Sequence, residues 1–234
     1  MNPILVALDV ESAEKAIALA DALRGAVGGF KIGKQLFTAA GPAVVRDLAG
    51  RGDRVFLDLK FHDIPNTVAG AVQSAVATGA WMVNVHASGG SAMMKAAAES
   101  ARKTAAGLGL TAPVVIGVTV LTSMNDQALA EIGVSRPMLE QVVHLARLAQ
   151  DSGLDGVVAS PQETPAIRKA CGQDFLIVTP GIRPADQQGK DDQARTLTPA
   201  EAMSAGASYL VIGRPITAAP NPREAAEKIS ASLL

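Results

Sequence analysis

The sequence predicts a single-domain (β/α)8 TIM barrel that spans residues 1–234. Apolar, strand-like runs alternate with helical segments eight times along the chain. The runs are continuously apolar, which is typical of parallel strands that are covered on both faces. A length of 234 residues accommodates eight such units around one core. A doubly wound open sheet is the alternative, but no Gly-x-Gly-x-x-Gly motif follows the first strand.

The first four strand–helix units follow from apolar runs and helix-start signals. We expect strands at Ile4–Asp9, Gly29–Gly33, Arg54–Phe61 and Met82–Ala87. Ser12 is suited to cap the first helix, in which Ala16, Leu19, Ala20 and Leu23 share one face. The next three helices are expected at residues 36–49, at residues 66–78 and through Met93 and Ala98.

The last four units carry clearer helix starts. Strands are expected at Val114–Leu121, Gly156–Ala159, Phe175–Thr179 and Tyr209–Ile212. The fifth helix is expected to begin near Ser135 and Pro137 and to stop at Gly153. The remaining three begin at Ser160-Pro161-Gln162-Glu163, which is typical of a capping box, at Thr198-Pro199-Ala200-Glu201, and at Asn221-Pro222-Arg223-Glu224.

Composition excludes several classes of function. The formal net charge of −1 provides no electrostatic reason to bind nucleic acid or an anionic membrane. A single cysteine, Cys171, excludes an internal disulfide framework and suits a reducing compartment. The first residues lack the basic region of a signal peptide, and no apolar run is long enough to cross a bilayer. We therefore expect a soluble, cytoplasmic protein.

Charge gathers at the end of the third strand, in the stretch from Phe56 to Thr67. Asp58 and Lys60 share one strand face, and Asp63 follows in the turn before the helix. Such charges are costly to bury unless they pair. A purely structural ion pair is the alternative. We favour a functional site, because the charges lie where a barrel strand opens onto a loop.

Other polar residues follow the remaining strands, at the same end of the predicted barrel. They are Asp9, Lys31, His86, Thr122, Ser123, the Gly181-Ile182-Arg183 segment and Gly213-Arg214. The loops after the seventh and eighth strands of such barrels commonly bind phosphate, and the two Gly-Arg segments lie there. The polar loop from Pro184 to Arg195 is either a lid, which would bring Gln193 to the phosphate, or simply flexible.

The histidines do not form a metal site. His62 is expected to be structural, and His86 could be a polar core residue bonded to Asn84. Neither histidine has a second one at the spacing of metal ligands. Since no dinucleotide-binding motif is present either, we predict neither a metal nor an organic cofactor.

The motifs together resemble those of the orotidine 5′-phosphate decarboxylase family. The similar segments are Phe56–Thr67, Val83–Ala87, Val118–Ser123, Val178–Pro184 and Val211–Pro215, and they run from the first strand to the eighth. The resemblance implies a homodimeric (β/α)8 barrel that converts orotidine 5′-monophosphate to uridine 5′-monophosphate.

The resemblance also implies roles for particular residues. The family's Lys-Asp-Lys-Asp array falls on Lys31, Asp58, Lys60 and Asp63. Asp63, Ile64 and Thr67 resemble the segment that reaches across the dimer interface. Asp9 matches a ribose contact, Thr122 lies in the pyrimidine-contacting loop, and Arg183, Gln193, Gly213 and Arg214 match the phosphate side. Residues 185–191 depart from the family pattern.

The chemistry implied is loss of CO2 from C6 of a pyrimidine, which leaves a carbanion without a neighbouring carbonyl. An ammonium group on Lys60 can stabilise this carbanion and then protonate it, and nearby aspartates favour its charged form. Asp58 would lie near the departing carboxylate and position Lys60.

Three alternatives remain open on the sequence. A class I aldolase needs a neutral lysine, which the aspartates beside Lys60 disfavour. A metal-dependent sugar-phosphate decarboxylase shares an Asp-x-Lys strand end. A non-catalytic phosphate-binding barrel would need no reactive group.

Overall fold

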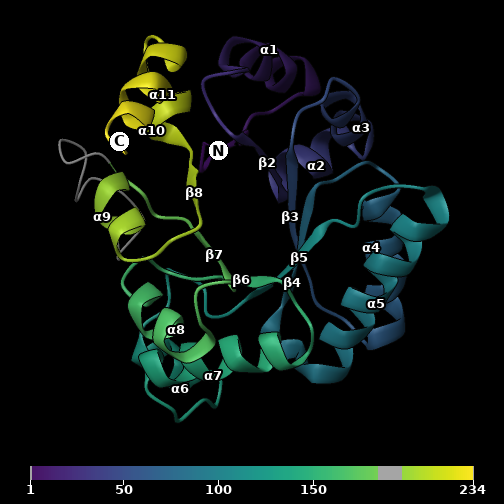
Figure 1. Ribbon diagram of the computed structural model, residues 1–234, viewed down its shortest axis with the longest axis vertical. Coiled ribbons are helices and arrows are strands. Elements are labelled where there is room, and N and C mark those ends of the chain that lie inside the picture. The colour runs from purple at the N-terminus through teal and green to yellow at the C-terminus, as the bar shows by residue number, and fades with distance from the viewer. Residues whose placement is uncertain (1, 184–196, 234) are drawn as a thin grey trace.

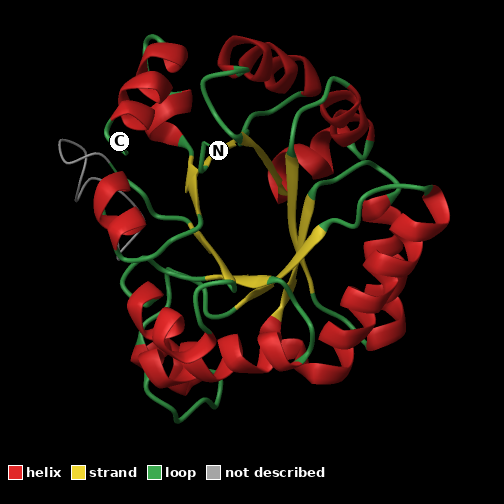
Figure 2. Ribbon diagram, viewed as in Figure 1, coloured by secondary structure: helices red, strands yellow, loops and turns green. Residues whose placement is uncertain are grey.

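The computed structural model describes residues 2–183 and 197–233, and within them the chain forms a closed barrel of parallel strands. The strands follow one another around the barrel in chain order, from β1 to β8, and β8 pairs with β1. Helices surround the ring of strands, and α11 lies beside α1 where the last unit closes against the first (Figures 1 and 2). The predicted (β/α)8 barrel is confirmed, and the open-sheet alternative is wrong.

All eight predicted strands are present. They are β1 (Ile4–Ala7), β2 (Gly29–Gly33), β3 (Val55–Phe61), β4 (Met82–His86), β5 (Val114–Val118), β6 (Gly156–Val158), β7 (Leu176–Thr179) and β8 (Tyr209–Ile212). β1 and β5 end earlier than expected, so Asp9 lies in the loop beyond β1, and Leu121 as well as Thr122 lies beyond β5.

The described helices cover the outside of the barrel. They are α1 (Ala13–Leu23), α2 (Lys34–Ala40), α3 (Ala43–Gly50), α4 (Pro65–Val76), α5 (Gly90–Leu108), α6 (Asp126–Glu131), α7 (Met138–Asp151), α8 (Thr164–Cys171), α9 (Pro199–Ser204), α10 (Arg214–Thr217) and α11 (Pro222–Ala231). A 3-10 turn, η1 (Ala87–Gly89), precedes α5. None of the helices in the described ranges is long and apolar enough to cross a membrane.

The helix boundaries differ from the expectations in three places. The helix expected at residues 36–49 is two helices, because Gly41 adopts φ 67° and Pro42 follows it. The short helices α6 and α10 were not anticipated. The helix expected from Ser160 begins only at Thr164, although Glu163 still accepts a hydrogen bond from the Ser160 amide at 3.0 Å. The predicted capping box between Thr198 and Glu201 is confirmed.

Alternation along each strand separates two apolar clusters. The inward-facing cluster includes Leu5, Phe56, Met82, Ile116 and Val178. The outward-facing side chains of the same strands pack under the helices in a larger cluster. At the end of the barrel where strands begin, Trp81 meets Tyr209 edge to face, with ring centroids 5.3 Å apart. The apolar filling therefore closes one end and leaves the other for polar residues.

Thr179, the last residue of β7, carries a buried hydroxyl group whose effect on stability can be tested. Its buried Oγ1 has no hydrogen-bond partner in the part of the chain that the structure describes. We expect Thr179→Val to stabilise the fold by about 1 kcal/mol, because it removes the desolvation cost of an unpaired hydroxyl at nearly constant shape. A rise in melting temperature of about 2–4 °C would be measured by calorimetry. A lower melting temperature would mean that the hydroxyl is satisfied.

Candidate active site

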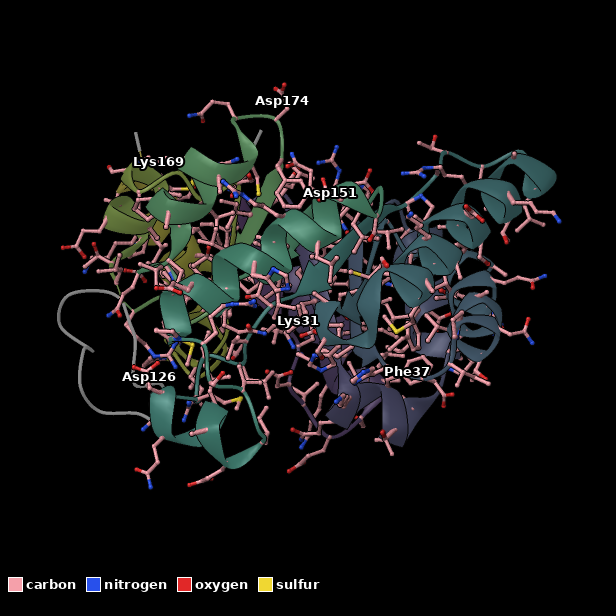
Figure 3. The ribbon with its side chains drawn as sticks, turned by 90° about the horizontal axis from the view of Figure 1, so that it is seen from below. Lys31, Phe37, Asp126, Asp151, Lys169 and Asp174 are labelled. Atoms are coloured by element: carbon pink, nitrogen blue, oxygen red, sulfur yellow. The ribbon has the colours of Figure 1, made fainter. Side chains whose placement is uncertain are left out.

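A cavity of about 610 Å³ opens at the carboxyl ends of the strands. The residues that line it come from β1, β2, β3, β5, β6 and β8, from loops after the strands and from α10: Ala7, Asp9, Lys31, Phe56, Asp58, Lys60, Val118, Val120, Leu121, Thr122, Ser123, Val158, Pro180, Gly181, Arg183, Val211, Gly213, Arg214 and Thr217. Figure 3 looks across the barrel, with Asp174 before β7 at one end and Asp126 after β5 at the other. Lys31 is labelled between them in this view, and its side chain is buried.

The first three strands bring four charged side chains together on one side of this cavity. Lys60 Nζ lies 2.6 Å from Asp58 Oδ1, and Lys31 Nζ lies 3.6 Å from Asp58 Oδ2. Lys31 also donates to Asp9 Oδ1 at 3.1 Å. Lys31 and Asp58 are 8% and 9% exposed, so the attraction between these two side chains is weakly screened, whereas the Asp9 side chain is 53% exposed. Each oxygen of Asp58 faces an ammonium group.

The ionised form of Asp58 is favoured by its neighbours. Burial by itself raises the pKa of its carboxyl group, but the charges of Lys60 and Lys31 and hydrogen bonds from Lys60 and Asn84 lower it. The balance leaves the pKa of Asp58 below its ordinary value. The site therefore presents a carboxylate between two ammonium groups at neutral pH.

Gly33, at the end of β2, leaves room for this cluster. A Cβ atom there would lie 2.8 Å from Lys31 Nζ and 3.1 Å from Asp9 Oδ1. The backbone of Gly33 is extended, with φ −93°, so alanine would strain only the packing. The glycine is needed for space rather than for backbone freedom.

We expect Gly33→Ala to lower kcat/KM about tenfold, because Lys31 Nζ must move away from its present position. The melting temperature should change by less than about 3 °C, since only the end of a flexible side chain is displaced. Gly50→Ala is the matched control, because a Cβ atom at Gly50 meets no atom within 4 Å. Wild-type kinetics for Gly33→Ala would show that the position of Lys31 is unimportant.

Asn84, in β4, is a site residue that sequence reasoning missed. The expected bond between Asn84 and His86 is wrong, because both ends of the Asn84 amide bind β3: Nδ2 donates to Asp58 Oδ1 at 2.7 Å, and Oδ1 accepts from the Lys60 amide at 2.8 Å. Asn84 is completely buried. A polar residue between Met82 and His86 on the inward face of an apolar strand was the available signal.

His62 and His86 lie outside the cavity lining. Their rings are 5.4 Å apart, with His62 exposed and His86 partly buried. Burial, His62 and Lys60, in that order, lower the pKa of His86 to about 4, so its imidazole is neutral at pH 7. Within the described ranges no group of three histidine, cysteine, aspartate or glutamate side chains is placed to hold a metal ion.

The late strands supply the opposite wall of the cavity. Gly181 and Arg183 follow β7, and Gly213 and Arg214 follow β8, as the sequence predicted. Arg183 is only 6% exposed, and its backbone amide donates to Leu197 at 3.0 Å, which ties together the segments on either side of residues 184–196. Gln193 lies outside the described residues. Thr122 and Ser123 line the cavity from the loop after β5.

The segment after β3 does not reach the cavity of its own chain. Asp63, Ile64 and Thr67 are exposed and absent from the lining, and Ile64 is 67% exposed. Asp63 Oδ1 accepts from the Ile64 amide at 2.6 Å, and no ion pair among the described residues joins it to Lys60. Asp63 therefore lies apart from Lys60 within one chain, and its place in the Lys31, Asp58, Lys60 and Asp63 array stays a prediction.

Comparisons with known proteins identify relatives over the whole chain. A family model for the orotidine 5′-phosphate decarboxylase / HUMPS family matches residues 2–229. An orotidine 5′-phosphate decarboxylase of Moorella thermoacetica is 58% identical over 99% of this chain and 92% of its own length. An orotidine 5′-phosphate decarboxylase of Paramagnetospirillum magneticum is 54% identical over 100% of this chain and 99% of its own length. The crystal structure of orotidine 5′-phosphate decarboxylase from Lactobacillus acidophilus matches with a TM-score of 0.88 and 40% identity, covering 100% of this chain and 99% of that one.

Proposed function

Because the chain belongs to the orotidine 5′-phosphate decarboxylase / HUMPS family, we propose that Lys60 protonates C6 of orotidine 5′-monophosphate as CO2 departs. The protein is a carboxy-lyase of pyrimidine biosynthesis, as its relatives at 52–58% identity are. The observation that carries the proposal is the Lys60 ammonium, 2.6 Å from Asp58 at the wall of the cavity.

Lys60 acts as both electrostatic partner and acid. Its positive charge stabilises the negative charge that develops on C6, and the same group then delivers a proton there. Phe56, Val118 and Val158 form an apolar lining next to the charge cluster, which strengthens this attraction by excluding water. No electron-sink cofactor is required, because the carbanion is stabilised directly.

Asp58 holds the ammonium group in place. It lies between Lys60 and Lys31, and its lowered pKa keeps it ionised during turnover. In this position it also faces the departing carboxylate. The contacts of Asp58 support a role in positioning Lys60. Lys31 also pairs with Asp9, which we assign to the ribose.

The opposite wall binds the phosphate. Arg183 and Arg214 provide guanidinium groups, and Gly213 exposes backbone beside them, across the cavity from Lys60. Gln193, which the family resemblance also assigns to the phosphate, lies outside the described residues. Thr122 contacts the pyrimidine. The volume of about 610 Å³ lies within the range typical of small-ligand sites.

The active enzyme is a homodimer in the cytoplasm. Asp63, Ile64 and Thr67 protrude from one chain, and an exposed isoleucine next to a carboxylate suits insertion into a partner's site. Asp63 of one subunit then joins Lys31, Asp58 and Lys60 of the other. This arrangement accounts for why the single chain leaves Asp63 apart from Lys60.

The alternatives make different demands on the site. An aldolase needs a neutral lysine, whereas Lys60 faces an ionised carboxylate. A metal-dependent decarboxylase needs free carboxylate oxygens, whereas both oxygens of Asp58 face ammonium groups. The names of the relatives also favour the nucleotide over a sugar phosphate.

Loss of orotidine 5′-monophosphate absorbance tests the proposal. We expect the purified protein to turn over this nucleotide at the same rate before and after exhaustive dialysis against EDTA, because Lys60 rather than a metal stabilises the carbanion. Activity that disappears on dialysis and returns with Mg²⁺ would favour the metal-dependent alternative. Nucleotide binding without turnover would leave only a binding protein.

A further inference from the structure

The pairing of β3 with β4 is interrupted beside the charge cluster. Leu57 pairs with Val83, and the next pair along the ladder is Phe61 with Val85. Residues 58–60 of β3 therefore lie opposite Asn84 alone, so β3 carries extra residues in a bulge. Bulges of this kind next to an active site commonly redirect a side chain.

The bulge places Lys60 in an unusual backbone conformation. Its φ is 53°, and it is the one non-glycine residue with positive φ in the described ranges. The left-handed conformation is unfavourable for a lysine and persists only where its surroundings hold it. The proposed proton donor is therefore attached to a strained backbone that needs support.

Asn84 provides that support through both ends of its amide. Its Oδ1 accepts from the Lys60 amide at 2.8 Å, and its Nδ2 donates to Asp58 Oδ1 at 2.7 Å. The same Asp58 oxygen accepts from Lys60 Nζ at 2.6 Å. The contacts form a closed ring from the Lys60 backbone through Asn84 and Asp58 to the Lys60 ammonium.

We propose that Asn84 is the positioning residue of this site, which holds the left-handed Lys60 backbone and orients Asp58 toward the Lys60 ammonium. The inference rests on the proposed role of Lys60. Asn84 does not line the cavity, so it acts through its two neighbours rather than on the substrate.

The ring requires an amide in particular. One end of the residue must accept from an N–H group, and the other must donate to an ionised carboxylate. Aspartate has the same shape but offers only acceptors when it is ionised, so it would face Asp58 with like charge. Alanine would leave the Lys60 amide and one contact of Asp58 unsatisfied.

The charged and titratable groups around Asn84 come from three strands. They are Asp58 and Lys60 on β3, Lys31 on β2 and His86 on β4 itself, with His62 just beyond β3; the neighbouring β5 is Val114–Val118 and contributes none. His86 is neutral above pH 5, since its pKa is lowered to about 4. A carboxyl group introduced at Asn84 would therefore titrate mainly against Asp58 and the two lysines.

Steady-state kinetics of Asn84→Asp from pH 5 to 9 test the proposal. At pH 8 we expect kcat to fall about 10²-fold relative to wild type, with KM changed by less than about threefold, because Lys60 rather than the phosphate side is displaced. As the pH falls, the new carboxyl group and Asp58 take up one proton, which restores a donor between them. The ratio of the kcat of Asn84→Asp to that of wild type should therefore rise about tenfold toward pH 5.

Two further variants separate positioning from general destabilisation. Asn84→Ala should lose a similar factor in kcat at every pH, because no protonation can restore the missing donor. Thr119→Val is the matched control: it removes a buried hydroxyl that donates to the Val158 carbonyl at 3.0 Å without touching Lys60 or Asp58. It should keep the kcat and pH profile of wild type.

The outcomes distinguish this inference from the proposed function. If wild type turns over orotidine 5′-monophosphate and Lys60→Ala does not, but Asn84→Ala keeps more than a third of kcat, the inference alone is wrong. A pH-independent ratio for Asn84→Asp would also overturn it. If Lys60→Ala keeps wild-type kcat, the proposed function itself fails, whatever the Asn84 variants do.

Discussion

A mixture of Lys60→Ala and Asp63→Ala dimers should recover about a quarter of wild-type activity after the subunits are exchanged. Each variant alone should be severely impaired, by about 10⁴-fold for Lys60→Ala and about 10²-fold for Asp63→Ala, because the proposed mechanism has each of these charges act on the transition state. Random re-pairing makes about half of the dimers mixed, and in each of these one site carries both substitutions and the other carries neither. The recovered activity would be measured by orotidine 5′-monophosphate absorbance.

The control is a mixture of Lys60→Ala with Asp58→Ala. Lys60 and Asp58 are in contact within one chain, at 2.6 Å, so every site in such a mixture keeps one lesion and no activity should return. Subunit exchange is verified with differently tagged chains. A mixture of Lys60→Ala and Asp63→Ala that stays as inactive as its parents, despite exchange, would place Asp63 in the site of its own chain.

Arg214→Ala should lower kcat/KM about 10²-fold, because it removes the proposed charge-assisted contact with the phosphate. Part of the loss should appear in kcat, since remote binding energy is used more fully in the transition state than in the bound substrate. Arg223→Ala is the matched control: Arg223 is an exposed arginine on α11, paired with Glu227 at 2.9 Å and remote from the cavity lining.

A substrate that lacks the phosphate shows how much the phosphate contact contributes to the rate of decarboxylation. Added phosphite should accelerate its decarboxylation by wild type, and much less by Arg214→Ala. If phosphite has no effect on wild type, the phosphate contact contributes only to binding. If the Arg214 and Arg223 variants behave alike, the phosphate is held elsewhere in the protein.

The sequence was sufficient for the barrel and for most of the cavity because both depend on local patterns. Continuous apolar runs predicted parallel strands, and the carboxyl ends of parallel strands converge in any closed barrel. Residues at those ends, such as Asp9, Lys31 and Arg214, could therefore be assigned to one cavity without knowing their contacts. The spacing of Asp58 and Lys60 on one strand similarly predicted their ion pair.

Turn chemistry limited the accuracy of the boundaries. The capping box at Thr198 was predicted correctly, because its residues interact within one turn. The similar pattern at Ser160 predicted a helix start too early: Glu163 does reach back to the Ser160 amide, but the intervening residues form a turn and the helix begins at Thr164. A local hydrogen bond can thus form without the helix that it usually accompanies.

Sequence patterns by themselves determined the strand order, the cavity's location and the charges that line it. Only the tertiary structure decided the fine geometry, because this depends on how separate strands pair. The bulge opposite Asn84 arises from the register between β3 and β4, and it gives Lys60 its left-handed backbone. Gly33 matters because two side chains from different segments meet where its Cβ would be. Asp63 is exposed and binds the Ile64 amide instead of Lys60. Proximity in sequence therefore did not determine whether these two side chains meet.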